Sequence, residues 1–148
     1  MSRLVFKNKH YLMSLFNRRT LVLLLIVLAG GLASMAKTFG VYGNLVRETE
    51  LLLGGDWALH ALLSSCLGLV ASWATPPVWL HRPIYLLSPI TLVILTMVMT
   101  DEILQAFSSL REFSVCDMVI NIIGVLFGAF IYSCWNHLFR KKAEACSK

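Results

Sequence analysis

The sequence predicts an all-α membrane protein, a small bundle of four transmembrane helices with a short outer interfacial or re-entrant helix between the third and fourth. Composition is the first observation: 57% of the 148 residues are hydrophobic and only 14% are charged, and the mean hydropathy is +0.72. The second is that four apolar stretches approach the length of about 20 residues that a helix needs to cross a bilayer. The third is that most charged residues lie between or beyond these stretches. One small helical bundle accounts for the whole chain.

The chain begins with a basic segment and the first predicted helix. Residues 1–19 mix five basic residues with apolar ones, a pattern typical of an amphipathic segment on the anionic cytoplasmic surface, or of a basic tail. Residues 20–36 are long and apolar enough for a helix. Ser34 to Ala36 also resembles a signal-peptidase site, and cleavage there would remove this helix. We favour a retained helix, because the basic leader is long for a signal and the apolar run continues past a typical signal core.

The middle of the chain predicts a loop and two further helices. Residues 37–56 contain glycines at both ends and are expected to form a loop whose last residues dip into the interface. The second helix is predicted at 57–74 and ends at Thr75-Pro76-Pro77, because proline lacks the amide donor that a helix requires. A short connection then leads to the third helix at about 84–100.

The last third predicts the outer helix, the fourth span and a basic tail. Apolar residues recur at helical spacing after Asp101, so a short, partly embedded helix is expected between 101 and 116. The fourth helix is predicted at 117–135, and the transmembrane domain as a whole covers 20–137. Residues 138–148 are predicted to form a basic cytoplasmic tail.

The fourth helix carries two small residues that we assign to helix packing. Gly124 and Gly128 form a GxxxG motif, which lets two membrane helices approach closely. The motif is common in membrane helices, so it favours a packing role over a role in a functional site.

Basic residues predict the orientation of the chain in the membrane. The termini and the loop around residue 82 hold 10 of the 13 lysines and arginines, and the opposite side holds only Lys37, Arg47 and Arg111. Because loops rich in lysine and arginine stay in the cytoplasm, both termini are predicted to be cytoplasmic. The net charge of +5 then reflects membrane orientation, and we do not expect nucleic-acid binding.

Polar residues gather on the outer side of this topology. Three helix ends carry polar pairs at i and i+4, which share one helix face: Asp56 with His60, Asp101 with Gln105, and Asp117 with Asn121. Glu102 and Arg111 lie in the same outer layer. Ionisable groups at the membrane edge usually face the bundle interior or a wet cavity. We therefore predict a polar pocket that is open to the outside.

Structural roles compete with this interpretation for each residue. Asp56 and Asp117 stand at helix starts, where an aspartate can cap the helix, and Ser114 with Asp117 resembles a capping box. His60 could donate to a neighbouring carbonyl, and Arg111 could pair with a nearby carboxylate.

The polar residues of the pocket suggest three kinds of function: metal binding, acid–base catalysis and transport. No HExxH or comparable metal motif is present, so no metal and no cofactor are predicted. Acid–base catalysis by His60 and the carboxylates stays open, and transport is disfavoured because the helix centres hold few polar residues.

The same residues resemble a known family. GDWALH at 55–60, DEILQAF at 101–107, Arg111, Ser114 and DMVINIIGVLFG at 117–128 together resemble the VanZ-like family of small bacterial membrane proteins. The resemblance covers about half of the chain, and the eight polar residues named above fall on the family's polar motif positions. Members often carry a lysine after the first aspartate, whereas this chain has Trp57. That departure implies a more acidic pocket.

The resemblance implies a multi-pass protein of the bacterial cytoplasmic membrane. The family's namesake activity is reduced susceptibility to teicoplanin, so an amphipathic antibiotic or a lipid-linked envelope precursor is the expected ligand, with the lipid bilayer as the surrounding partner. Two alternatives stay open: an enzyme acting on a lipid-linked substrate, and a non-catalytic subunit of an envelope complex. The sequence does not define the oligomeric state.

Overall fold

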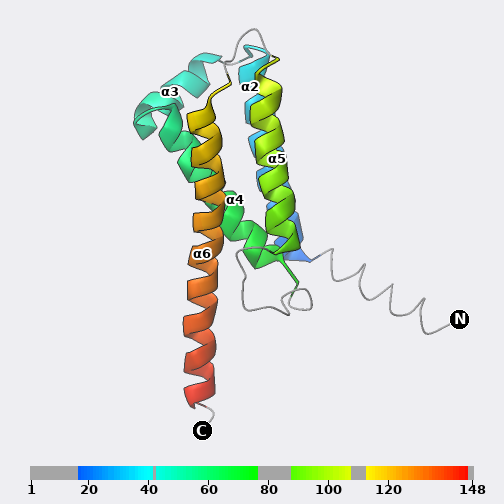
Figure 1. Cartoon of the computed structure of the whole chain (residues 1–148), viewed down its shortest axis with the longest axis vertical. Coiled ribbons are helices and arrows are strands. Elements are labelled where there is room, and N and C mark those ends of the chain that lie inside the picture. Colours follow the sequence, from blue (N-terminus) through cyan, green and yellow to red (C-terminus); the bar gives the residue numbers. More distant parts are fainter. Residues whose placement is uncertain (1–16, 42, 77–87, 108–112, 147–148) are drawn as a thin grey trace, which may run out of the picture.

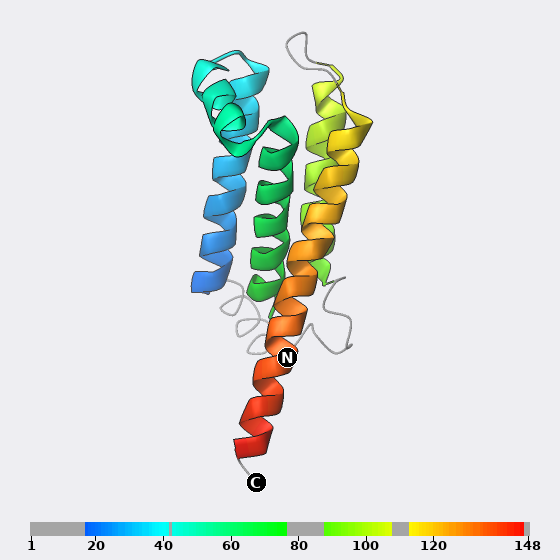
Figure 2. The same cartoon turned by 90° about the vertical axis from the view of Figure 1, so that its left-hand side faces the viewer.

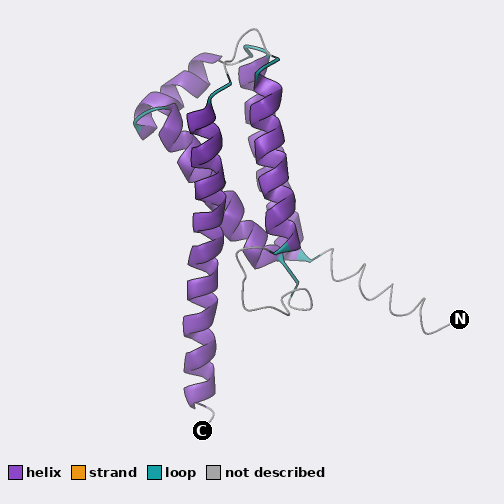
Figure 3. Ribbon diagram, in the orientation of Figure 1, coloured by secondary structure: helices purple, strands orange, loops and turns teal. Residues whose placement is uncertain are grey.

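All secondary structure in the described part of the chain is helical (Figure 3). The computed structural model describes residues 17–41, 43–76, 88–107 and 113–146. Its helices are α2 (Arg18–Thr38), α3 (Gly43–Leu53), α4 (Asp56–Ala74), α5 (Pro89–Gln105) and α6 (Val115–Cys146). The predicted basic leader lies almost entirely outside the described residues.

Three of the described helices are long and apolar enough to cross a membrane. They are α2, α4 and the part of α6 from Val115 to Phe139. Most of their large apolar side chains face outward, where lipid would surround them. Helix α5 has 17 residues, which corresponds to about 25 Å and is shorter than the roughly 30 Å hydrocarbon layer. A multi-pass membrane protein is supported, and a bundle of four spans is not confirmed.

The helices stand side by side, and α4 with α6 forms the most extensive contact (Figures 1 and 2). Three glycines make this contact close. A Cβ atom at Gly68 would collide with the backbone of Val125, one at Gly128 with the backbone of Ser65, and one at Gly124 with the side chain of Ser64. The small residues therefore set the distance between α4 and α6.

Helix α2 is held mainly near its two ends. Leu23 is its one buried residue among those described. Near its start, the Arg19 guanidinium lies 5.3 Å from the ring centre of Trp73 on α4 and donates to the Trp73 carbonyl at 3.4 Å. The contacts at its other end involve polar residues and belong to the candidate site.

A chain of buried hydroxyl groups connects α4 to α5 at the end of the bundle away from α3. Ser88 Oγ lies 2.8 Å from Thr75 Oγ1 and 2.8 Å from Thr91 Oγ1, and it accepts a hydrogen bond from the Thr91 amide at 3.1 Å. Ser88 thus caps α5 and joins it to the last turn of α4. These paired hydroxyls explain how polar groups are tolerated inside the bundle.

The expected loop at 37–56 is wrong in part, because most of it is helix α3. Gly40, Gly54 and Gly55 have φ angles of 69°, 96° and 126°, and they bound the helical segment on both sides. The residues between them are mostly leucine, glutamate and other side chains that suit a helix. The glycines mark only the ends of this segment, and the residues between them determine that it is helical.

Two further helix boundaries differ from the expected ones. Residues 101–105 form the last turn of α5 rather than a separate outer helix, because no glycine or proline interrupts the helix after Thr100. The expected interfacial or re-entrant helix is therefore not confirmed, and residues 108–112 lie outside the described part. Helix α6 continues beyond residue 135 to Cys146, so the expected basic tail extends the fourth helix (Figure 1).

Candidate functional site

Polar side chains converge at the end of the bundle where the ends of four long helices meet. The C-terminal ends of α2 and α5 lie at the same end of the bundle as the beginnings of α4 and α6, and α3 covers part of this end (Figures 1 and 2). Alternating helix directions place these ends together, as the predicted topology required.

One lysine joins three helices at this end. Lys37 Nζ on α2 donates to Glu50 Oε1 on α3 at 2.5 Å and to Asp56 Oδ1 on α4 at 2.9 Å. The Lys37 and Glu50 side chains are 27% and 17% exposed, so the pair is partly shielded from water. The pocket is therefore less acidic than the sequence predicted. Lys37 supplies the positive charge that is missing at position 57, where this chain has a tryptophan.

His60 lies between an aspartate and an asparagine. Its Nε2 atom is 3.5 Å from Asp56 Oδ1, and its Nδ1 atom is 3.3 Å from Asn121 Oδ1 on α6. Asn121 Oδ1 can only accept a hydrogen bond, so a protonated Nδ1 can donate to it. The Nε2 atom is the ring nitrogen that faces Asp56.

Neither Asp56 nor Asp117 caps its helix with its side chain. Gly55 is the N-cap of α4 and makes no side-chain cap bond, while Asp56 binds Lys37. Ser114 caps α6, because its Oγ accepts a hydrogen bond from the Asp117 amide at 3.2 Å. One carboxylate oxygen each of Asp56 and Asp117 and one ring nitrogen of His60 all lie within 4.8 Å of one another.

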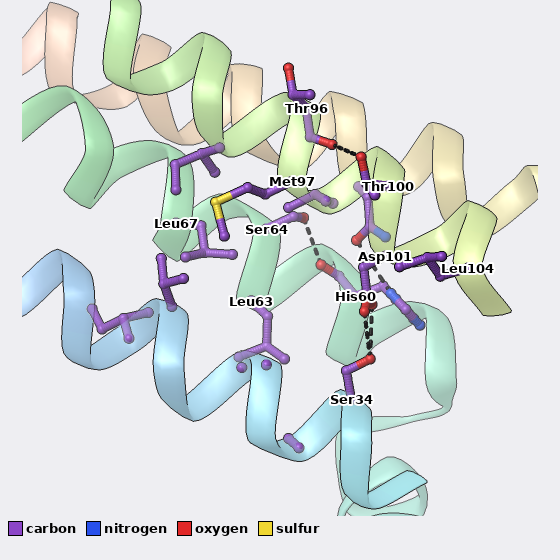
Figure 4. A pocket seen from close by; sticks show the side chains of 18 of the residues that line it. Ser34, His60, Leu63, Ser64, Leu67, Thr96, Met97, Thr100, Asp101 and Leu104 are labelled. Atoms are coloured by element: carbon purple, nitrogen blue, oxygen red, sulfur yellow. Dashed lines mark hydrogen bonds between the residues drawn. The ribbon is translucent and has the colours of Figure 1, made fainter. Parts of the chain in front are cut away.

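Asp101 connects α5 to α2. Ser34 Oγ lies 2.8 Å from Asp101 Oδ1 and 2.9 Å from Oδ2 (Figure 4). Gln105 Nε2 donates to Asp101 Oδ2 at 3.1 Å. The pairing of Asp101 with Gln105 follows the i, i+4 spacing of the sequence. In the sequence, Ser34 stands out only as part of the possible cleavage site. Its contact with Asp101 arises because the fold brings α2 and α5 together at this end.

Glu102 faces α6 and not the cavity. Its side chain is 1% exposed, and Oε1 accepts a hydrogen bond from the Ser114 amide at 3.2 Å. The carboxylate thus holds the end of α5 against the beginning of α6. Arg111, which was expected in the same layer, lies outside the described residues.

A cavity of about 690 Å³ lies between α2, α4 and α5. Its walls are mostly apolar and include Leu63, Leu67 and Met97, whereas Ser34, His60 and Asp101 line one end (Figure 4). Helices α2 and α5 each pack on α4 and make little contact with each other. The cavity therefore has an apolar depth and a polar end.

The structure brings the predicted polar residues together only in part. Four of them line the cavity, namely Asp56, His60, Asp101 and Asn121. Asp117 lies beside His60, and Gln105 binds Asp101, although neither lines the cavity. Sequence reasoning missed Ser34, Lys37 and Glu50, of which only Lys37 carried a signal, as a lone cation just after an apolar stretch.

The helices and their polar end define a class of protein, a multi-pass helical membrane protein with a polar site at one end of its bundle. The model of the VanZ/LLP1 family matches residues 5–139. The chain therefore belongs to the VanZ/LLP1 family. Searches of curated proteins and of solved structures gave no match.

Proposed function

We propose that this VanZ-like membrane protein binds an amphipathic component of the cell envelope in an outward-facing pocket. The observation that carries this proposal is the cavity with an apolar depth and a polar end. A ligand with a polar headgroup and an apolar chain matches both parts. A lipid-linked envelope precursor and a teicoplanin-like antibiotic share this chemistry.

The cavity has room for part of such a ligand, a polar headgroup and a segment of its apolar chain, and it is accessible from the bilayer. Its volume of about 690 Å³ falls within the range of roughly 300–1,000 Å³ that is typical of small-molecule sites. Because α2 makes little contact with α5, the space between them offers an apolar chain a way in from the bilayer. The headgroup would then meet His60, Asp101 and Lys37 at the polar end. Arg111 is expected to meet an anionic group of the ligand.

The orientation is part of the proposal. The excess of lysine and arginine at the termini supports cytoplasmic ends in a bacterial cytoplasmic membrane, and with that orientation the polar end of the cavity would face outward. An outward-facing pocket meets envelope precursors and antibiotics on the side where both are encountered.

Filling the cavity tests the binding proposal. Gly30 lines the cavity, and a Cβ atom there meets nothing within 4 Å, so Gly30→Leu should occupy the cavity without disturbing the helix. The matched control is Ala29→Leu, since Ala29 is an exposed neighbour on α2 that does not line the cavity. Native mass spectrometry of protein in nanodiscs that contain undecaprenyl phosphate should show the lipid bound to the wild type and to Ala29→Leu, but not to Gly30→Leu. Equal lipid binding by all three proteins would contradict the proposal.

A phenotype in cells tests the polar end and the second ligand. Combined alanine substitutions at His60, Asp101 and Arg111 should abolish any protection against teicoplanin while the membrane level of the protein is unchanged. A triple variant that behaves as the wild type would end the pocket proposal. Binding of the lipid without any change in teicoplanin susceptibility would assign the pocket to the lipid.

The surroundings of His60 favour one second candidate, acid–base catalysis on a lipid-linked substrate. Asn121 orients the ring, and Asp56 lies next to its other nitrogen, which is the arrangement of a positioned general base. Deletion of the gene should then lead to accumulation of an unprocessed lipid, and His60→Gln should not reverse it. An unchanged lipid profile would exclude this candidate.

A further inference from the structure

We propose that Asp56, His60 and Asp117 form a binding site for one divalent zinc ion between α4 and α6. The site combines one imidazole nitrogen with two carboxylate oxygens, all within 4.8 Å of one another. Zinc accepts both donor types and keeps an open position when three protein ligands bind it.

The distances require only small side-chain adjustments. Zinc bonds to nitrogen and oxygen are about 2.0–2.2 Å long, so neighbouring ligands of a tetrahedral ion lie roughly 3.4 Å apart. The largest separation in the cluster is 4.8 Å. Rotation of the two aspartate side chains can shorten the present separations to those around a zinc ion. Both aspartates lie in the first turns of their helices.

Asn121 prepares His60 as a ligand. Asn121 is 7% exposed, and its Oδ1 atom lies 3.3 Å from His60 Nδ1, where it can accept a hydrogen bond from that nitrogen. The Nε2 atom lies 3.5 Å from Asp56 Oδ1 and is thus the ring nitrogen placed to bind a metal together with this carboxylate. Outer partners such as Asn121 are typical of metal-binding histidines.

Asp117 supplies a carboxylate that serves no other contact within the described residues. Ser114 already caps α6, so the Asp117 carboxylate is not needed for that purpose. No hydrogen bond or ion pair to this carboxylate comes from the described chain, and the side chain is partly buried. The Asp117 carboxylate near His60 is the third proposed ligand. The spacing of residues in the sequence does not show that it lies so close to His60.

The local charges also favour a divalent ion. Asp56, Asp117 and Glu50 are three carboxylates, and among the described residues Lys37 is the one lysine that contacts two of them, Glu50 and Asp56. Lys37 can remain paired with Glu50 at 2.5 Å while Asp56 turns towards the ion. Two uncompensated negative charges are then neutralised by one divalent cation.

The close α4–α6 contact holds the ligands in place. Asp56 and His60 belong to α4, Asp117 belongs to α6, and Gly124 lies against Ser64 one turn further into the bundle. Ligands on rigid helices keep their positions better than ligands on loops. If the proposed function holds, an anionic headgroup at the polar end of the cavity would meet the open coordination position.

Zinc stoichiometry tests the site. Full-length protein in nanodiscs is treated with a chelator, dialysed against Zn²⁺ and examined by elemental analysis. About one zinc ion per chain is expected for the wild type, and none for Asp117→Asn or His60→Gln. Asn121→Ala should weaken zinc binding about 10- to 100-fold, since it removes an outer partner of the histidine.

Matched controls separate the site from adventitious binding. Glu48→Gln removes an exposed carboxylate on α3, and His137→Ala removes an exposed histidine that lies one turn from Cys134 on α6. Both variants should keep the zinc ion. Cobalt absorption bands in the visible range should likewise disappear in His60→Gln and persist in His137→Ala.

Two results would overturn the zinc proposal. One is zinc binding that survives in both Asp117→Asn and His60→Gln, and the other is its loss in His137→Ala. Thermal unfolding without metal shows whether the ligand variants are folded. Gly30→Leu should still bind zinc although its cavity is filled, so failure of the lipid proposal and failure of the zinc proposal give different results.

Discussion

Lys37 shows how a single side chain connects three separate helices. Its ammonium group binds Glu50 on α3 and Asp56 on α4, and its own helix α2 has little other buried contact. Because partly buried carboxylates are costly without a partner, this lysine stabilises both acidic residues at once. It also supplies a positive charge 2.9 Å from Asp56 Oδ1.

Replacement of Lys37 should therefore destabilise the protein. Lys37→Met removes the partner of two carboxylates and should lower the free energy of unfolding by about 1–3 kcal/mol. The additional change Glu50→Gln should recover part of this loss. Arg47→Gln is the control, since Arg47 is an exposed basic residue on α3. Thermal unfolding in detergent provides the measurement, and equal effects of Lys37→Met and Arg47→Gln would contradict the assigned role.

Ser34 permits a comparison between two serines. Ser34 Oγ binds Asp101 across the gap between α2 and α5, whereas the buried Ser133 Oγ has no partner within the described residues. Ser34→Ala should lower the free energy of unfolding by about 0.6–2 kcal/mol, as for other hydrogen bonds between membrane helices. Ser133→Ala should be neutral or stabilising, because it removes an unsatisfied hydroxyl. The reverse order of unfolding temperatures would show that Ser34 does not support α2.

The polar residues were predictable where they share a helix, and much less so where they come from different helices. The i, i+4 spacing predicted that Asp101 lies near Gln105, and the structure shows this hydrogen bond. The contacts of Lys37 and Ser34 join residues that are distant in the sequence, and no local pattern encodes them. The sequence predicted Asp117 and His60 in one polar pocket, but no local motif indicated how close they lie, because Asp117 belongs to α6 and His60 to α4.

At the scale of elements, the α4–α6 pair depends on glycine. Added side-chain atoms at Gly68 and Gly128 meet backbone, which cannot rotate out of the way. Both glycines are buried, and Val125 and Ala129 beside them on α6 are fully buried. The pair thus forms the part of the fold on which the positions of His60 and Asn121 depend.

A larger residue at Gly128 should separate the two helices. Gly128→Leu should lower the free energy of unfolding by about 1–3 kcal/mol, the usual cost of overpacking. Gly31→Ala is the control, since a Cβ atom at Gly31 meets nothing within 4 Å and alanine favours the helix. The unfolding temperature in detergent should fall only for Gly128→Leu. An unchanged temperature for that variant would mean that α4 and α6 can move apart without loss.

The helices themselves were predicted better than the segments between them. Long apolar runs located α2, α4 and α6, because burial in lipid requires such runs. Helix α3 was missed, since flanking glycines resemble a loop and the helix is held by contacts of Glu50 with Lys37. Helix α5 continues beyond the predicted end at Thr100 to Gln105, because the charges of Asp101 and Glu102 do not stop a helix.

In the molecule as a whole, polar side chains gather at the two ends of the helical bundle. One end carries the acidic groups and the polar part of the cavity, and the other carries the hydroxyl chain around Ser88 and the contact of Arg19 with Trp73. Helix α2 is thus fixed near both ends, and the apolar part of the cavity lies along it. This arrangement leaves room for an apolar chain between α2 and α5 without loss of the contacts that hold α2.

The native cysteines can determine which end faces outward. Cys116 is exposed in the first turn of α6 at the acidic end, whereas Cys146 ends the same helix beyond the opposite end of the bundle. With cytoplasmic termini, a membrane-impermeant maleimide should label intact cells through Cys116, and Cys116→Ser should abolish this labelling. A variant that retains only Cys146 should be labelled only after the membrane is permeabilised. Labelling of Cys146 in intact cells would reverse the orientation, and it would place the polar end of the cavity, with its proposed ligands, on the cytoplasmic side.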